Sequence, residues 1–138
     1  MAWNEKIPQN EIEVKVTKAS VDFAERFGNH LGCDKKEMTN NGREKVTEAK
    51  LTTSQLRKFF GEVKRQQMEG YNPTKFILLK PKLAYAVGRA KDPKAKINDF
   101  YYVIAQAIDR VNDENQFKNF IQIFEAIVAY HKASEETK

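Results

Sequence analysis

The sequence predicts an all-α protein, a compact bundle of about five helices, on three observations. Apolar residues recur at the spacing of one helix face through most of residues 51–131. Capping residues, Gly and Pro separate these periodic segments, so the connections between helices are short. The chain has 138 residues, of which 41% are hydrophobic and 31% charged, which suits one globular domain. We divide it into an N-terminal segment 1–50 packed on the bundle, a helical bundle 51–133 that carries a basic face, and a frayed tail 134–138.

The N-terminal segment gives the weakest pattern. Residues 11–16 alternate charged and apolar positions, which is typical of a short strand or an extended arm. A short helix is predicted next, capped by Ser20 or Asp22 and ended by Gly32. Its apolar face would consist of Phe23, Phe27 and Leu31.

Residues 34–50 are polar and contain Asn40-Asn41-Gly42, a sequence typical of a tight turn. We therefore expect mostly loop here, with a short helix toward Lys50 as the alternative. The segment would connect the short N-terminal helix to the bundle.

The bundle begins with a clear start signal. Thr52, followed three residues later by Gln55, forms a capping box, in which the two side chains satisfy free backbone N–H groups of the first turn. The helix is expected to end near Gly70, before the break at Asn72-Pro73. Its apolar face consists of Leu56, Phe59, Phe60 and Val63. Gly61, inside this helix, costs about 1 kcal/mol relative to Ala and is interpreted as tolerated.

The second bundle helix is expected to start after Pro73 and run to about Lys91, and it contains Pro81. Proline removes a backbone donor and crowds the preceding turn, so the helix either kinks at Pro81 or restarts with Pro81 in its first turn. Two amphipathic helices follow it. The apolar residues of the first are Ile97, Phe100, Tyr101, Ile104, Ala107, Ile108 and Val111, and those of the second are Phe117, Phe120, Ile121, Phe124, Ile127, Val128 and His131.

Several classes of protein are unlike this sequence. No apolar run approaches the ~20 residues that span a bilayer, and residues 1–6 lack the apolar core of a signal peptide. A single cysteine, Cys33, cannot form an intramolecular disulfide, which suits a reducing compartment. We expect a cytoplasmic protein without membrane contact.

Catalytic and cofactor signatures are also missing from the sequence. It has no phosphate-binding or dinucleotide-binding glycine motif and no pair of histidines spaced to bind a metal on one helix. His30, Cys33 and Asp34 lie close in sequence, but further soft ligands are few, so we interpret their roles as structural or incidental. His131 continues an apolar stripe and is interpreted as a residue at the edge of the core. We therefore expect no enzymatic activity, no cofactor and no bound metal.

Positive charge is concentrated in the middle of the chain. Residues 50–96 contain twelve Lys or Arg and three Asp or Glu, a net charge of +9, whereas residues 1–49 have −1 and residues 97–138 have −3. The whole chain has only +5. This segregation favours a surface that binds a polyanion such as nucleic acid over general solubilisation. A solvated basic face without a ligand is the alternative.

The cations of this segment fall on two predicted helices, which as neighbours would form one positive groove. If the second helix is continuous, Lys75, Lys82 and Arg89 recur every seven residues on one surface, which Tyr85 shares. The cations would bind phosphates, and Tyr85 would either stack on a base or sugar or fill the core. The predicted RNA-binding residues are Arg57, Lys58, Lys64, Lys75, Lys80, Lys82, Tyr85, Arg89 and Lys91.

Three blocks stand in order along the bundle. They are Leu51-Thr52-Thr53-Ser54-Gln55-Leu56-Arg57-Lys58-Phe59, Phe76-Ile77-Leu78-Leu79-Lys80-Pro81-Lys82-Leu83-Ala84-Tyr85-Ala86-Val87-Gly88-Arg89 and Phe124-Glu125-Ala126-Ile127-Val128-Ala129-Tyr130-His131-Lys132. Together they resemble the small subunit of type III-A CRISPR (Csm) effector complexes. The resemblance covers about 51–132, and its specificity comes from the order and spacing of the blocks, since none is a catalytic signature. Residues 1–50 carry no pattern that we match to this family.

The resemblance implies a small helical subunit, present in several copies, that stacks into a filament beside the backbone subunits holding the guide RNA. Such a filament lines the channel where target RNA pairs with the guide, and contacts the RNA backbone without cutting it. The implied partners are target RNA, the guide RNA backbone, the backbone and large subunits of the Csm complex, and other copies of the chain as a dimer or head-to-tail filament. The implied role is in antiviral defence, without catalysis by this subunit. Base pairing with the guide would read the sequence of the target RNA. The leading RNA contacts would be Arg57, Lys58, Lys80, Lys82 and Arg89.

Two alternatives from other classes stay open. A helix-turn-helix regulator would read duplex DNA, but Gln66-Gln67 offers few base-contacting side chains and Pro81 interrupts a straight recognition helix. A helical adaptor without nucleic-acid contact would leave the basic stripe solvated. Within the favoured interpretation, the acidic residues 97–138 would meet the basic face of a neighbouring copy, and Asp109 and Glu125 would take part in this contact.

Overall fold

Six helical segments and a two-stranded hairpin make up the part of the chain that the computed structural model describes, residues 3, 5–8, 11–92 and 94–136. The elements are α1 (Lys18–Leu31), β1 (Lys35–Met38), β2 (Glu44–Glu48), α2 (Thr53–Glu69), α3 (Pro73–Ile77), α4 (Leu79–Ala90), α5 (Ile97–Asp109) and α6 (Glu114–Glu136). Because a single residue, Leu78, separates α3 from α4, these two form one broken rod. The prediction of about five helices is therefore confirmed.

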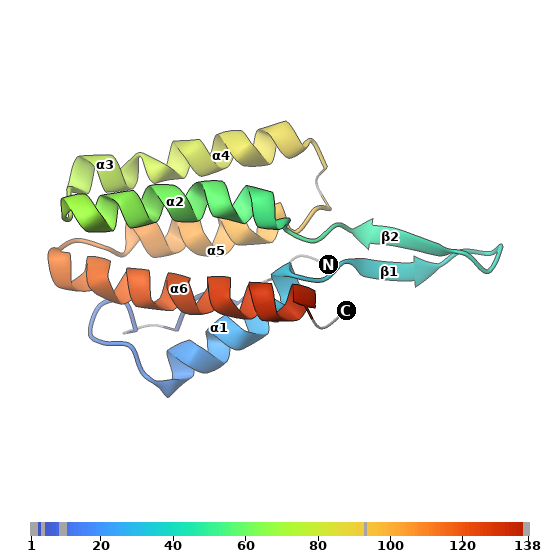
Figure 1. Ribbon diagram of the computed structural model, residues 1–138, viewed down its shortest axis with the longest axis horizontal. Helices are drawn as coiled ribbons and strands as arrows, with labels where there is room; N and C mark the ends of the chain where they lie inside the picture. The colour runs from blue at the N-terminus through green and yellow to red at the C-terminus, as the bar shows by residue number, and fades with distance from the viewer. Residues whose placement is uncertain (1–2, 4, 9–10, 93, 137–138) are drawn as a thin grey trace.

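Figure 1 shows how these elements are arranged. The rods α2, α3–α4, α5 and α6 lie side by side, and α1 packs on α6. The hairpin β1–β2 projects beyond the end of the bundle where α2 and α5 begin. Within the described part of the chain, none of the helices has the length and apolar character needed to cross a membrane.

The start of α2 and the break before α4 follow from local sequence. Thr52 Oγ1 accepts from Gln55 N at 3.1 Å and Gln55 Oε1 accepts from Thr52 N at 2.9 Å, so the predicted capping box is confirmed. Asn72 caps α3 through Lys75 N at 3.1 Å. Pro81 lies in the first turn of α4, where its missing N–H costs no helical hydrogen bond. The helix thus restarts before Pro81, which settles the choice that the sequence left open.

The N-terminus of α1 differs from the prediction. Thr17 is the N-cap, not Ser20 or Asp22; Ser20 is instead the third helical residue, and its Oγ accepts from Thr17 N at 3.1 Å. The Glu11 carboxylate accepts hydrogen bonds from the hydroxyls of Ser20 and Thr17, and these bonds lower the pKa of Glu11. Residues 11–14 form a turn, so the strand or extended arm expected over 11–16 is wrong. The helix ends at Gly32, as predicted.

Residues 35–48 form an antiparallel hairpin, where the sequence predicted mostly loop or a short helix. Met38 pairs with Glu44 next to the turn, and Gly42 in the turn has φ +77°, which glycine adopts without strain. The turn was predicted, but the strands were missed because β1 is exposed on both faces and lacks an apolar alternation. Met38 and Val46 both expose their side chains on this hairpin.

The core joins helices that are far apart in sequence. The ring of Phe59 from α2 lies 5.6 Å from the rings of both Phe100 in α5 and Phe124 in α6, in edge-to-face arrangements. Gly28 lets α1 approach α6 closely, because a Cβ there would lie 2.7 Å from Tyr130 Cβ. The segment that precedes the hairpin is therefore packed against the last helix of the chain.

The end of α6 is more ordered than its composition indicated. The helix continues to Glu136, so the frayed tail predicted from residue 134 is helical over its first three residues, and residues 137–138 lie outside the described part. Ser134 is buried, with its Oγ 2.9 Å from Cys33 Sγ. His131, predicted at the edge of the core, is fully inside it, where Nε2 donates to the Leu51 carbonyl at 2.6 Å. This bond ties α6 to the start of α2.

Candidate nucleic-acid interface

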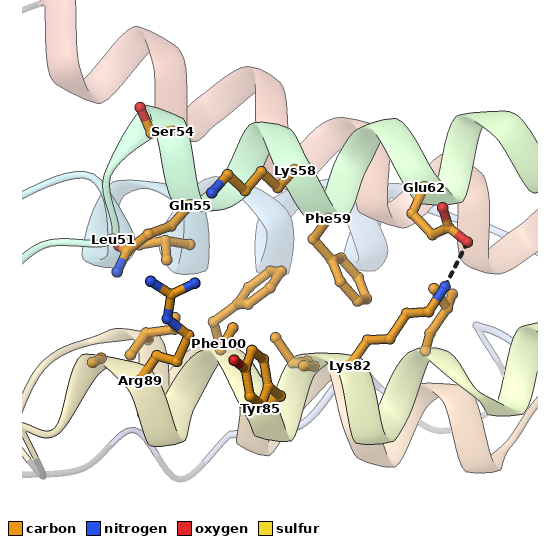
Figure 2. A pocket seen from close by; sticks show the side chains of 15 residues that line it. Leu51, Ser54, Gln55, Lys58, Phe59, Glu62, Lys82, Tyr85, Arg89 and Phe100 are labelled. Atoms are coloured by element: carbon orange, nitrogen blue, oxygen red, sulfur yellow. Dashed lines mark hydrogen bonds and ion pairs between the residues drawn. The ribbon is translucent and has the colours of Figure 1, made fainter.

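A groove of about 540 Å³ runs between α2 and α4, with the start of α5 beneath it (Figure 2). Its floor is apolar and consists of Leu51, Phe59, Leu79, Leu83, Ile97 and Phe100. All six belong to the hydrophobic core, so the groove opens directly above the core. We call this feature the α2–α4 groove.

Polar side chains form the two rims of the α2–α4 groove at helical spacing. On each helix they recur at i, i+3 and i+7, which places them on one face. They are Gln55, Lys58 and Glu62 on α2, and Lys82, Tyr85 and Arg89 on α4. Figure 2 shows Lys58 and Arg89 extending from opposite walls toward the same end of the groove.

An ion pair closes the other end of the groove. Lys82 Nζ lies 3.0 Å from Glu62 Oε1, so the two rims are bridged there. Glu62 also accepts from the Arg65 guanidinium at 2.6 Å. Hydrogen bonds from Arg65 and then Lys82 lower the pKa of Glu62 to about 2. The one carboxylate of the groove is therefore ionised at neutral pH and fully occupied by cations.

The open end of the groove carries uncompensated positive charge. Within the described residues, neither Lys58 nor Arg89 forms an ion pair. The Arg89 guanidinium lies 6.0 Å from the centroid of the Tyr85 ring, and Tyr85 is 69% exposed, so its ring is not part of the core. Gln55 Oε1 is used in the capping box, which leaves its Nε2 to donate toward the groove.

Two predicted RNA contacts lie away from the groove and are already paired. Lys64 Nζ lies 2.6 Å from Glu125 on α6, and Lys80 Nζ lies 2.7 Å from Asp109 on α5. Asp109 and Glu125, expected to meet a neighbouring copy, are thus engaged inside the chain. The acidic last third of the sequence neutralises part of its basic middle within the same molecule.

The remaining predicted residues lie outside the groove. Lys75 lies on α3, before the break at Leu78, and its Nζ is 3.2 Å from Glu69, so it faces α2 as Lys82 does. Arg57 and Lys91 are exposed but do not line the groove. Of the nine predicted residues, the groove is lined by Lys58, Lys82, Tyr85 and Arg89.

Sequence reasoning missed Gln55 and Glu62 as groove residues. Both lie at helical spacing from Lys58, so the signal was present along α2. Gln55 was assigned only to the capping box, which in fact orients its amide toward the groove. Glu62 was missed because the sequence was searched for cations, whereas Glu62 is the carboxylate that pairs with two of them, Arg65 and Lys82.

Three possible metal ligands meet near the start of α5. Atoms of His30, Glu48 and Asp99 lie within 4.8 Å of one another. His30 Nε2 donates to Asp99 Oδ2 at 2.7 Å, and the buried Lys96 Nζ donates to the His30 carbonyl at 2.7 Å. Burial lowers the pKa of Lys96. These hydrogen bonds link α1 to the start of α5.

The other two residues considered for a metal site have separate partners. Cys33 contacts Ser134, and Asp34 Oδ1 accepts from Lys50 N at 2.8 Å. His30, Cys33 and Asp34 therefore have structural contacts in different directions.

Comparison with protein families gives one result. The family described as Csm2 Type III-A matches residues 19–137, which includes α1 except its first residue, the hairpin and the bundle. The match thus extends into residues 1–50, where the sequence resemblance found no pattern. Comparison with curated proteins and with solved structures gives no match.

Proposed function

The chain belongs to the Csm2 family, the structural small subunits of type III-A CRISPR complexes, and from this membership we propose that it holds RNA by the phosphate backbone on the face formed by α2 and α4. As a member it assembles with other Csm proteins. In our proposal it lines the channel for target and guide RNA, acts without catalysis in the cytoplasm, and contributes to antiviral defence. Guide pairing would read the target sequence, so the subunit needs only sequence-independent contacts.

The observation that carries the proposal is the pair Lys58 and Arg89 at the open end of the α2–α4 groove. They come from different helices, point toward the same space, and lack carboxylate partners in the described part of the chain. Two such cations gain more from a phosphate than cations that are already paired, because binding releases counterions without breaking an existing contact.

Lys82 and Lys75 form a second group. Each is paired with a glutamate, but more than half of each side chain is exposed. An exposed ion pair such as Lys75–Glu69 contributes only about 0–1 kcal/mol, so a phosphate can displace that carboxylate at little cost. Lys82 keeps its bond to the less exposed Glu62 and would meet RNA through its exposed side. These lysines, with the exposed Arg57 and Lys91, would extend the RNA path beyond the groove. Lys64 and Lys80 would contribute least.

The proposal is tested by fluorescence anisotropy with single-stranded RNAs of several sequences, at several salt concentrations. The full chain and the complex reconstituted from it are both measured. We compare Lys58→Ala/Arg89→Ala with Lys64→Ala/Lys80→Ala, which removes the same charge from paired sites outside the groove. Binding should be nearly sequence-blind, and the first variant should lower the magnitude of the log–log salt slope by about 1.4, or about 0.7 per phosphate contact.

The matched variant shows whether RNA binding depends on the two groove cations or only on the net charge of the protein. If both double variants weaken binding equally, RNA senses only net charge and the groove has no special role. If the wild type shows no salt-sensitive RNA binding, alone or assembled, the chain is a protein adaptor within its complex. Circular dichroism of each variant verifies that it remains folded.

A further inference from the structure

We propose that the α2–α4 groove binds one unstacked base of single-stranded RNA, with the adjoining phosphate on Lys58 and Arg89. This inference rests on the proposed function and adds to it, since backbone contacts alone require no groove. Three properties of the groove support a base: an exposed aromatic ring on its rim, an excess of hydrogen-bond donors, and an apolar floor with one closed end.

The exposed ring is that of Tyr85. Its side chain is 69% exposed although it borders an apolar floor, and the Arg89 guanidinium lies 6.0 Å from its centroid. Aromatic rings beside arginine are the usual platform for bases of single-stranded nucleic acid, and they accept every base because each has a π face. A base stacked on Tyr85 would cover a ring that the fold itself leaves in water.

The polar groups of the groove favour an anionic ligand rich in acceptors. Lys58, Arg89 and Gln55 Nε2 can only donate hydrogen bonds. The carboxylate of Glu62 is already saturated by Arg65 and Lys82. A nucleotide supplies phosphate oxygens together with ring nitrogens and carbonyl oxygens. An acidic peptide supplies carboxylates but no flat ring, and so would leave Tyr85 uncovered.

The shape of the groove suits one inserted group. Its volume of about 540 Å³ lies within the range of about 300–1,000 Å³ found for small-molecule sites. The Lys82–Glu62 bridge closes one end, so a strand cannot run straight through along both rims. The backbone would therefore pass the Lys58–Arg89 end and send a single base inward over Leu83 and Phe100.

Binding of RNA with normal bases and of abasic RNA of the same length separates this inference from backbone binding. Wild type, Tyr85→Ala, Tyr85→Phe and Ala86→Phe are compared, free and in the reconstituted complex. Ala86 lines the groove, so Ala86→Phe fills it without changing the charge. Tyr85→Phe keeps the ring and serves as the matched control, and the exposure of Tyr85 means that its variants remove little of the core.

We expect wild type to bind normal RNA about 5-fold or more tightly than abasic RNA, the effect of stacking one base. Tyr85→Ala and Ala86→Phe should lose this preference and match wild type on abasic RNA, whereas Tyr85→Phe should keep it. Equal binding of both RNAs by wild type overturns the inference and leaves backbone binding intact. If wild type binds neither normal nor abasic RNA, both proposals are overturned. If Ala86→Phe impairs assembly with the other subunits but not RNA binding, the groove holds a protein segment and the inference is wrong.

Discussion

Substitution of Gly28 by alanine tests the close crossing of α1 and α6. An added Cβ would lie 2.7 Å from Tyr130 Cβ, 2.8 Å from the Ile127 carbonyl oxygen and 2.9 Å from the His131 amide nitrogen. Two of these atoms belong to the backbone of α6 and cannot rotate away. The helices α1 and α6 must therefore separate, which disturbs the packing of Phe27 beside the crossing.

The magnitude follows from two opposing contributions. Alanine stabilises a helix interior by about 1 kcal/mol relative to glycine. Overpacking of a tight core costs about 1–3 kcal/mol, and contacts with backbone atoms place this site in the upper part of that range. We expect a net loss of about 1–2 kcal/mol in the free energy of unfolding, equivalent to a decrease in Tm of about 3–8 °C for a domain of this size.

Gly61→Ala is the matched control. A Cβ at Gly61 would have no neighbour within 4 Å, so only the gain in helix propensity remains. This variant should raise the free energy of unfolding by about 1 kcal/mol. Both variants are measured by urea and thermal unfolding, followed by far-UV circular dichroism. The reasoning is refuted if Gly28→Ala stabilises the protein as Gly61→Ala does, since α1 would then not approach α6 closely.

Three further predictions concern contacts that hold the fold. The folded pKa of Glu62, about 2, lies below its unfolded value, so its ion pairs stabilise the fold above about pH 4.5 and this contribution is lost as pH falls toward 2. Urea unfolding should show Glu62→Gln less stable than wild type near pH 6 and nearly equal near pH 2, and a constant difference would contradict this. Joining Lys36 to Val46 by an Asn-Gly turn should change the Tm by little, because the residues removed are exposed, and a large loss would mean that the hairpin supports the bundle. His131→Ala should cost about 2–4 kcal/mol in chemical unfolding, because it leaves a cavity and a buried Leu51 carbonyl without its donor; a cost below about 1 kcal/mol would disprove that role.

The helices of the bundle were predictable from residue 51 onward because periodicity and capping residues agree there. Thr52 with Gln55 located the start of α2, and Pro81 indicated an interruption before α4 without deciding between a kink and a restart. The cap of α1 was misplaced because Ser20 satisfies the same rule as Thr17, and the Glu11 carboxylate that joins them lies six residues before Thr17, outside the capping motif. Capping rules do not distinguish such candidates when a residue outside the motif decides between them.

The hairpin was missed for a different reason. Strands are recognised by one buried face, and residues 35–38 have none. Only the turn at Gly42 carried a signal, and a turn alone does not specify what flanks it. The exposed Met38 and Val46 would have been read as loop residues by any rule based on burial.

The candidate site was predicted as a positive groove between two helices, with Lys82, Tyr85 and Arg89 on one surface, but which cations have carboxylate partners was not predicted. Lys58 and Lys64 are equivalent in a count of charges, yet Lys64 is paired with Glu125 and Lys58 faces the groove. Which cations have partners depends on how α5 and α6 pack against α2 and α4, and sequence spacing along one helix does not contain that information.

Lysine-reactivity footprinting of the assembled complex tests the central claim most directly. The complex is treated with an acetylating reagent with and without target RNA, and modification at each lysine is quantified by mass spectrometry. Lys118, exposed on α6 and absent from the α2–α4 groove, is the internal reference. The account predicts that RNA protects Lys58 severalfold while Lys118 is unchanged. Equal reactivity of Lys58 with and without target RNA, in a complex that has bound the RNA, would contradict it.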